Sequence, residues 1–178
     1  MTRVPELDVT ELDERQRAVY RSIAGSRAME RVIGPLNIWL RNPELAETAQ
    51  RLGAYCRFGT KLPTRLSELA ILVIAVHWQA DFEWWAHRPI AVGAGLDPAL
   101  LDRLAAGDPV RFETPDEQVV YEFTRELLQN QKVSDSLFER GRAILGLDGV
   151  IDLTGILGYY TLIAMTVKVF EIAIPTGE

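Results

Sequence analysis

Repeated helix-start signals constrain the fold of this chain more than any other feature. Asn42-Pro43, Asp97-Pro98 and Thr114-Pro115 each pair a capping residue with a proline. Asn, Asp and Thr side chains cap helix N-termini, and proline suits the first helical position because its missing N–H is not needed there. Elsewhere apolar residues recur at helical intervals, and strand signals are nearly absent. The sequence therefore predicts an all-α fold.

The helix boundaries follow from these caps and from the apolar spacing. An amphipathic helix is expected over 12–23, and the segment 25–41 is expected to be a loop with its own apolar contacts, at a site or a subunit edge. Thr114 and Glu117 have the spacing of a capping box. The remaining helices are expected from Asn42 to about Phe58, after Pro63-Thr64, from Asp97 to before Gly107, from Thr114 to about Asn130, from Ser134 to near Gly146, and from Asp148 to about Phe170.

Length and composition predict one ordinary globular domain. The 178 residues are 48% hydrophobic and 25% charged, which is enough for one sizeable core. We expect a single domain over 1–178, with an N-terminal helix and loop over about 1–60 and core helices over about 61–174. The net charge of -6 disfavours a nucleic-acid partner, because such proteins concentrate Lys and Arg.

Cysteine content and hydropathy predict a cytoplasmic protein. Cys56 is the only cysteine, which excludes an intramolecular disulfide and fits a reducing compartment. No signal peptide is expected, because the N-terminus has no apolar run. The longest apolar run, Leu153 to Val167, is shorter than the roughly 20 residues of a bilayer span. We therefore expect a core helix there, and no membrane partner.

A candidate acid/base site lies between Glu68 and His87. Glu83 and His87 are four residues apart, so they share one face of a helix. Glu68 would lie about 28 Å from His87 in one straight helix of 1.5 Å rise per residue. The two can cooperate only if the chain reverses near 79–81, with Asp81 capping the second helix. No Gly or Pro marks that reversal.

Several segments resemble the carboxymuconolactone decarboxylase and alkylhydroperoxidase D family. They are the spacing of Glu68, Ala80, Glu83 and His87, the following Ala91 and Gly95-Leu96, the stretches RLSELAILVIA, EWWAH, VVYEFTRELL, VSDSLF and LTGILGYYTLIAMTVKVFEIAIP, and GPLNIWLRNPELA at 34–46. The resemblance covers about 60–178. It implies an all-helical bundle, a central helical hairpin that carries the site, and assembly as a homotrimer or homohexamer.

The chain departs from the peroxidase branch of that family at two positions. Ala80 and Glu83 stand where the branch has its Cys-x-x-Cys pair. A dithiol peroxidase needs one thiolate to attack the peroxide and a second thiol to resolve the product. Cys56 lies outside the motif, among apolar neighbours, and is expected to be a buried structural residue.

The remaining residues resemble the decarboxylase branch. This implies a cofactor-independent decarboxylase, or a related lyase or isomerase, acting on a small carboxylated lactone or similar aromatic-degradation intermediate. Glu68, Glu83 and His87 are the expected catalytic residues, with His87 as proton donor or relay, oriented by Glu83 and also by Glu68. Two alternatives stay open: a peroxidase-like member without the cysteine pair, and a binding or assembly module without turnover.

The expected substrate-binding residues are His77, Trp84 and Tyr160. Trp78, Trp84 and Trp85 fit either an apolar pocket or the core and subunit contacts. Arg65 and Arg88 fit either ligands of a substrate carboxylate or surface ion pairs. Tyr159 and Lys168 are plausible pocket residues. The side chains of His77, Asp81, Glu83 and His87 are of types that bind divalent metals. No metal is expected, because these last four residues divide between two faces of a helix.

Overall fold

The computed structural model describes residues 2–175, and helices, turns and loops account for all of them. The all-α prediction is confirmed. In chain order the elements are η1 (Val9–Glu11), α1 (Glu14–Arg27), α2 (Gly34–Trp39), α3 (Pro43–Phe58), α4 (Thr64–Trp78), α5 (Asp81–Gly93), α6 (Pro98–Ala105), α7 (Pro115–Asn130) and α8 (Asp135–Phe170).

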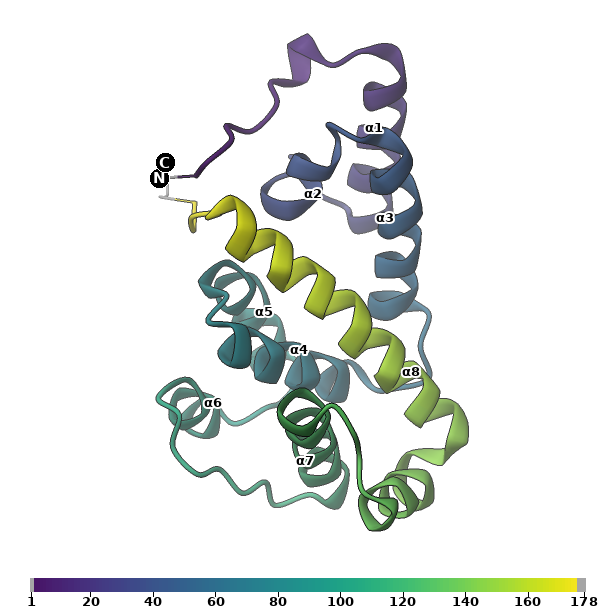
Figure 1. Cartoon of the computed structure of the whole chain (residues 1–178), viewed down its shortest axis with the longest axis vertical. Helices are drawn as coiled ribbons and strands as arrows, with labels where there is room; N and C mark the ends of the chain where they lie inside the picture. Colours follow the sequence, from purple (N-terminus) through teal and green to yellow (C-terminus); the bar gives the residue numbers. More distant parts are fainter. Residues whose placement is uncertain (1, 176–178) are drawn as a thin grey trace.

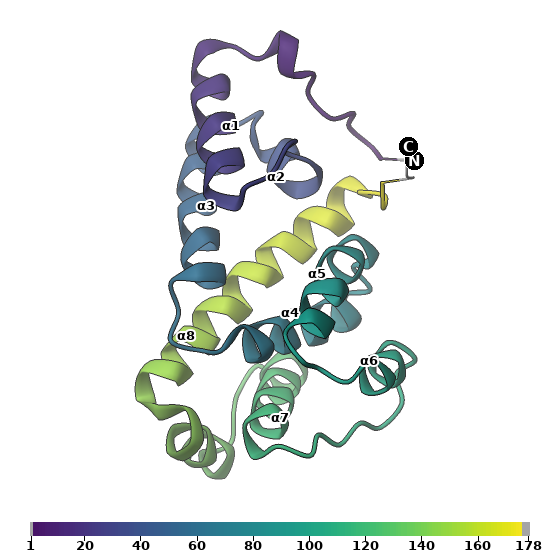
Figure 2. The same cartoon turned by 180° about the vertical axis from the view of Figure 1, so that it is seen from behind.

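The long helix α8 organises the bundle. It runs diagonally across the molecule, with α1–α3 on one side and α4–α7 on the other (Figures 1 and 2). It packs directly on α2, α3, α4 and α7. The N-terminal segment returns to the end of α8, where the Arg3 amide donates a 2.9 Å hydrogen bond to the Phe170 carbonyl oxygen.

Helix α4 contains the longest uninterrupted buried stretch of the described residues, and it packs on α5, α7 and α8. Every residue from Leu66 to Ala75 is buried. Each fully buried Leu or Ile side chain contributes about 1.5–3 kcal/mol through removal of apolar surface from water. The same stretch buries Glu68. A buried carboxyl group is costly unless it is hydrogen-bonded, so its partner is important for the stability of the bundle.

The chain reverses between α4 and α5, as the site requires. Gln79 adopts the left-handed conformation with φ of 51°. The Ala80 amide donates to the Ala75 carbonyl oxygen at 2.8 Å, and Lys168 on α8 donates to the Gln79 carbonyl oxygen at 3.1 Å. The expected cap is wrong, because Ala80 occupies the N-cap position and Asp81 is the first residue of α5. At this position the negative charge of Asp81 interacts favourably with the positive end of the helix dipole.

The segment expected to be a loop over 25–41 is partly helical. Helix α1 continues to Arg27, and all six residues of α2 are buried. Gly34 has φ of 62°, and a Cβ there would overlap the Phe82 ring. Only glycine accommodates both constraints. The close approach brings α2 onto the hairpin.

Three expected capping interactions do not form. Thr114 and Ser134 lie at N-cap positions without a side-chain cap hydrogen bond, and Glu117 pairs with Arg65 instead of closing a capping box. Gly146 has φ of 74° and ψ of 166°, which is not a helical conformation, so α8 consists of two helical stretches that meet at a kink at this residue, as expected from the sequence. Asp148 lies within this helix and pairs with Lys61.

Helix α8 is long and apolar enough to cross a membrane by length and composition, with a mean hydropathy of 1.6 over its most apolar window. However, 61% of that window is buried inside the protein. Core helices pass the same test, and the packing of α8 on four other helices identifies it as one.

Candidate active site

The hairpin joins Glu68 on α4 to His87 on α5. The Nδ1 atom of His87 lies 2.7 Å from Oε2 of Glu68, and both side chains are buried. When Glu68 is ionised, His87 must donate through Nδ1, which fixes the tautomer of the neutral imidazole. The Nε2 atom is then free to accept or relay a proton on the opposite side of the ring.

Glu83 faces that opposite side. Its Oε2 atom lies 3.7 Å from Nε2 of His87, which is longer than a hydrogen bond. The shared helical face predicted from sequence is confirmed. The expected order of the two carboxyl groups is reversed, however, because Glu68 makes the short orienting contact and Glu83 stands across the ring.

Burial raises the pKa of Glu83 to about 7. Its desolvated position is the largest cause; the charge of Glu68 raises the pKa further, while His87 and Arg57 oppose the rise. A carboxyl group with a pKa near neutrality is suited to proton transfer. The site therefore holds three differently placed groups: Glu68, buried and hydrogen-bonded to His87; His87, with its second nitrogen toward Glu83; and Glu83, whose carboxyl group is suited to proton exchange.

A cavity of about 480 Å³ opens on Glu83 and His87. Its volume suits a small organic ligand. Glu68 lies behind His87 and does not line it. The lining residues are Arg27, Met29, Ile33, Pro35, Leu36, Arg57, Phe82, Glu83, Trp85, Ala86, His87, Pro89, Tyr159, Tyr160 and Ile163.

Two tyrosines of α8 complete one wall of the cavity. Tyr160 meets His87 edge-on with 5.1 Å between ring centroids, and Tyr159 packs edge-on against Tyr160 at 5.2 Å. Burial raises the pKa of Tyr159 to about 12 and that of Tyr160 well above its usual value. Both are thus neutral hydroxyl groups near pH 7, able to donate hydrogen bonds.

The other two expected substrate-binding residues lie elsewhere. His77 is exposed and lines a separate hollow with Asp108 and Arg125, and Trp84 lines another with Asp81. The reversal at Gln79 separates the end of α4 from the face of α5 that carries Glu83. Neither residue lines the Glu83–His87 cavity. Lys168 is also absent from its lining and instead contacts Gln79.

The arginines of the cavity are not those singled out from sequence. Arg65 pairs with Asp116 at 2.6 Å, and Arg88 pairs with Asp102 at 2.6 Å, so the ion-pair interpretation is confirmed for both. Arg27 and Arg57 line the cavity instead. They lie in the last turns of α1 and α3. Basic residues are common there because their positive charge interacts favourably with the negative end of the helix dipole. No local sequence signal distinguishes them as site residues.

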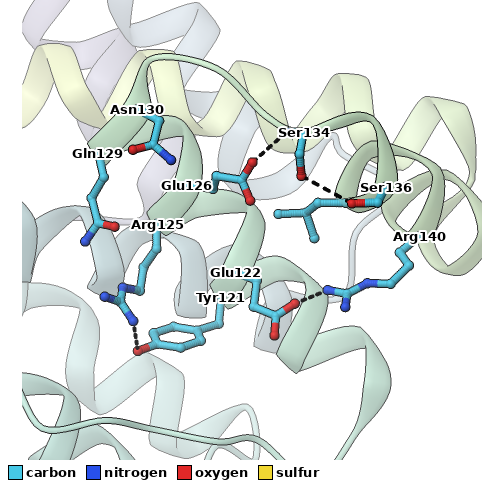
Figure 3. Close-up of a pocket in the computed structure, with 10 residues that line it drawn as sticks. Tyr121, Glu122, Arg125, Glu126, Gln129, Asn130, Ser134, Ser136 and Arg140 are labelled. Atoms are coloured by element: carbon cyan, nitrogen blue, oxygen red, sulfur yellow. Dashed lines mark hydrogen bonds and ion pairs between the residues drawn. The ribbon is translucent and has the colours of Figure 1, made fainter.

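A second hollow of similar size lies between α7 and the start of α8 (Figure 3). Its charged groups are already used internally. Glu122 pairs with Arg140, Arg125 donates to the Tyr121 hydroxyl at 3.0 Å, and Glu126 accepts from the backbone of the loop before α8. These contacts join two helices, so this hollow is a structural junction.

Cys56 is buried, as expected. Burial is the largest cause that raises the pKa of its thiol to about 11, with the charge of Asp152 adding to it. A thiol with this pKa provides very little thiolate at neutral pH, and thiolate is the form that attacks peroxide. The environment of Cys56 argues against a peroxidase mechanism.

Comparisons with known proteins identify the fold. No family model and no curated protein sequence matches the chain. One similar solved structure is an uncharacterised peroxidase-related protein from Silicibacter sp. TM1040, with a TM-score of 0.78, 14% identity, and coverage of 98% of this chain and 92% of that chain. Another is an uncharacterised peroxidase-related protein with an alkylhydroperoxidase D core from Ralstonia eutropha JMP134, with a TM-score of 0.78, 13% identity, and coverage of 98% and 92%. A third is a protein of unknown function from Agrobacterium tumefaciens, described as a candidate antioxidant-defence protein of the alkylhydroperoxidase D type, with a TM-score of 0.70, 16% identity, and coverage of 82% and 100%. The expected fold is confirmed: the chain has the helical fold of alkylhydroperoxidase D-like proteins.

The raised pKa of Glu83 predicts a pH-dependent loss of stability. Between its usual value of 4.5 and about 7, the unfolded chain releases this proton while the folded chain keeps it, so rising pH favours unfolding. Relative to Glu83→Gln, the wild-type free energy of unfolding should fall across this window by at most roughly 3 kcal/mol and then level off. Urea unfolding at pH 4 to 8 measures this difference. A difference independent of pH would contradict the assigned pKa.

Proposed function

We propose that the protein is a cofactor-independent decarboxylase, or a related lyase or isomerase, that acts on a small carboxylated lactone. The observation that carries this proposal is the row Glu68–His87–Glu83 at the wall of an organic-ligand-sized cavity. The carboxyl group of Glu83 and the imidazole of His87 both line this cavity, and Glu68 lies behind the imidazole. The resemblance of the sequence to the decarboxylase branch supplies the substrate class, since fold alone does not.

The proposed reaction needs one proton and no redox step. The bond between the substrate carbon and its carboxylate breaks, and the electron pair of that bond enters the conjugated carbonyl system. Carbon dioxide leaves, and Glu83 delivers a proton to carbon. Nε2 of His87 carries no proton in the tautomer that Glu68 fixes, so it first takes up a proton from solvent and then passes it to Glu83, which restores both groups to their starting state. Glu68 keeps the imidazole in the tautomer and orientation that this relay requires.

The walls of the cavity fit this chemistry. Apolar side chains such as Leu36, Phe82 and Ile163 line much of it. An apolar surrounding destabilises a carboxylate more than neutral carbon dioxide, because only the charged group loses strong hydration. The hydroxyl group of Tyr160, the tyrosine next to His87, is suited to stabilise charge that develops on the lactone carbonyl oxygen.

Carbon dioxide release from γ-carboxymuconolactone tests this function. We expect His87→Ala and Glu83→Gln each to lower the rate by about 10²- to 10⁴-fold, as for other positioned acids and bases. The exposed Glu113→Gln serves as the matched control and should leave the rate unchanged. No release by the wild-type protein, or full release by both site variants, would contradict the proposal.

We also propose that the protein is a homo-oligomer, assembled through α8. The exposed face of this helix carries Leu147, Ile151, Leu162, Met165 and Val169. They form two groups with helical spacings of three or four inside each group and eleven residues, about three turns, between the groups. This line spans about 33 Å at 1.5 Å per residue, and exposed apolar surface of this kind commonly marks an interface. If two copies of α8 pack antiparallel, the apolar line of one copy lies against the same line of the other copy. Such an isologous contact produces even-numbered assemblies, which favours a hexamer over a trimer.

Light scattering measures this assembly. We expect the wild-type mass to be a multiple of 20.0 kDa, and the double substitution Ile151→Glu with Met165→Glu to reduce it, because two charges interrupt the apolar line. Val9→Glu changes an apolar residue of similar exposure outside the line and should leave the mass unchanged. A wild-type monomer would contradict the proposal.

A cytoplasmic location remains a prediction from the sequence.

A further inference from the structure

Two arginines face the cavity without a carboxylate partner. Among the residues that the structure describes, no Asp or Glu oxygen lies within ion-pair distance of Arg27 or Arg57. The hydrogen bonds of Arg27 go to neutral acceptors, the Ser26 hydroxyl at 3.1 Å and oxygens of Gln50 at 3.4 Å. Both guanidinium groups are half-buried. A half-buried cation without an anionic partner is unfavourable on its own and is well suited to an anionic ligand.

The neighbourhood of Arg27 is built by close packing. Gly53 on α3 is buried, and a Cβ at this position would overlap the hydroxyl group of Tyr159 and approach the Nη2 atom of Arg27 to 2.8 Å. The absence of a side chain at Gly53 therefore lets both polar groups lie against α3. The result is a guanidinium and a phenolic hydroxyl held side by side at the cavity wall.

Arg57 connects this region to the proton-transfer site electrostatically. Its charge opposes the burial-driven rise in the pKa of both Glu83 and Tyr160. Glu83 is the one carboxyl group among the described lining residues, and its raised pKa leaves it partly neutral. The cavity lining thus carries two cations and little negative charge to balance them.

We infer that Arg27, Arg57 and the hydroxyl group of Tyr159 form an anion subsite that binds a carboxylate of the ligand. This inference rests on the proposed function, which it deepens. A carboxylate held by two guanidinium groups is stabilised as an anion, and that would oppose its loss as carbon dioxide. The bound carboxylate is therefore a different one from the leaving group. The subsite selects a ligand with a second acidic group and orients the reacting carbon toward Glu83.

Binding measurements test the subsite without any need for turnover. The probes are a butenolide with an acetic acid side chain and the methyl ester of the same compound, titrated calorimetrically into the full-length protein at pH 6, where the acid is ionised and Glu83 is mostly protonated. We expect the acid to bind at least about tenfold more tightly than the ester, because hydrogen bonds to charged groups are strong. Arg27→Gln and Arg57→Gln should each reduce this preference by about tenfold or abolish it. Arg21→Gln, an exposed arginine on the same helix α1, should retain it.

Three results would overturn the subsite: equal binding of acid and ester to the wild-type protein, an acid preference that survives both cavity variants, or no measurable binding of either probe at millimolar concentration. The outcome is separable from that of the carbon dioxide assay. An arginine-dependent acid preference without carbon dioxide release would support the subsite and reject the decarboxylase. Carbon dioxide release, together with an acid preference that both cavity variants retain, would support the decarboxylase and reject the subsite.

Discussion

The buried hydrogen bond between Glu68 and His87 is the interaction on which the site depends. It links the centre of α4 to α5 across a tight reversal, with 2.7 Å between the two side chains. A carboxyl group inside an apolar helix would be strongly destabilising without such a partner. The same contact leaves the other imidazole nitrogen facing the cavity. One interaction thus serves both the packing of the hairpin and the orientation of the proposed proton relay.

The position of Glu83 gives the site its proposed chemistry. The sequence resemblance aligns Glu83 with a cysteine of the peroxidase branch, so this chain has an acid where that branch has a redox group. Desolvation raises its pKa to about 7, whereas Cys56 is too deeply buried to act as a reactive thiolate. The chain combines the helical fold of alkylhydroperoxidase D-like proteins with a cavity suited to proton transfer.

The local pattern predicts the helices, the shared face of Glu83 and His87, and the need for a reversal. It does not predict how the reversal forms, because Gln79 adopts a left-handed conformation without the glycine that usually marks one. Cavity residues from distant elements are also missed. Arg27 and Arg57 resemble ordinary basic residues at helix ends, and only the packing of α1 on α3 and of α3 on α8 brings them to the cavity.

The most direct test of the account is an NMR titration of the Glu83 carboxyl carbon in protein labelled with ¹³C-glutamate, assigned by the signal that disappears in Glu83→Gln. The account predicts a midpoint near pH 7 for this resonance. A midpoint close to the ordinary glutamate value of about 4.3 would contradict the proposed acid, because Glu83 would then hold no proton to donate at neutral pH.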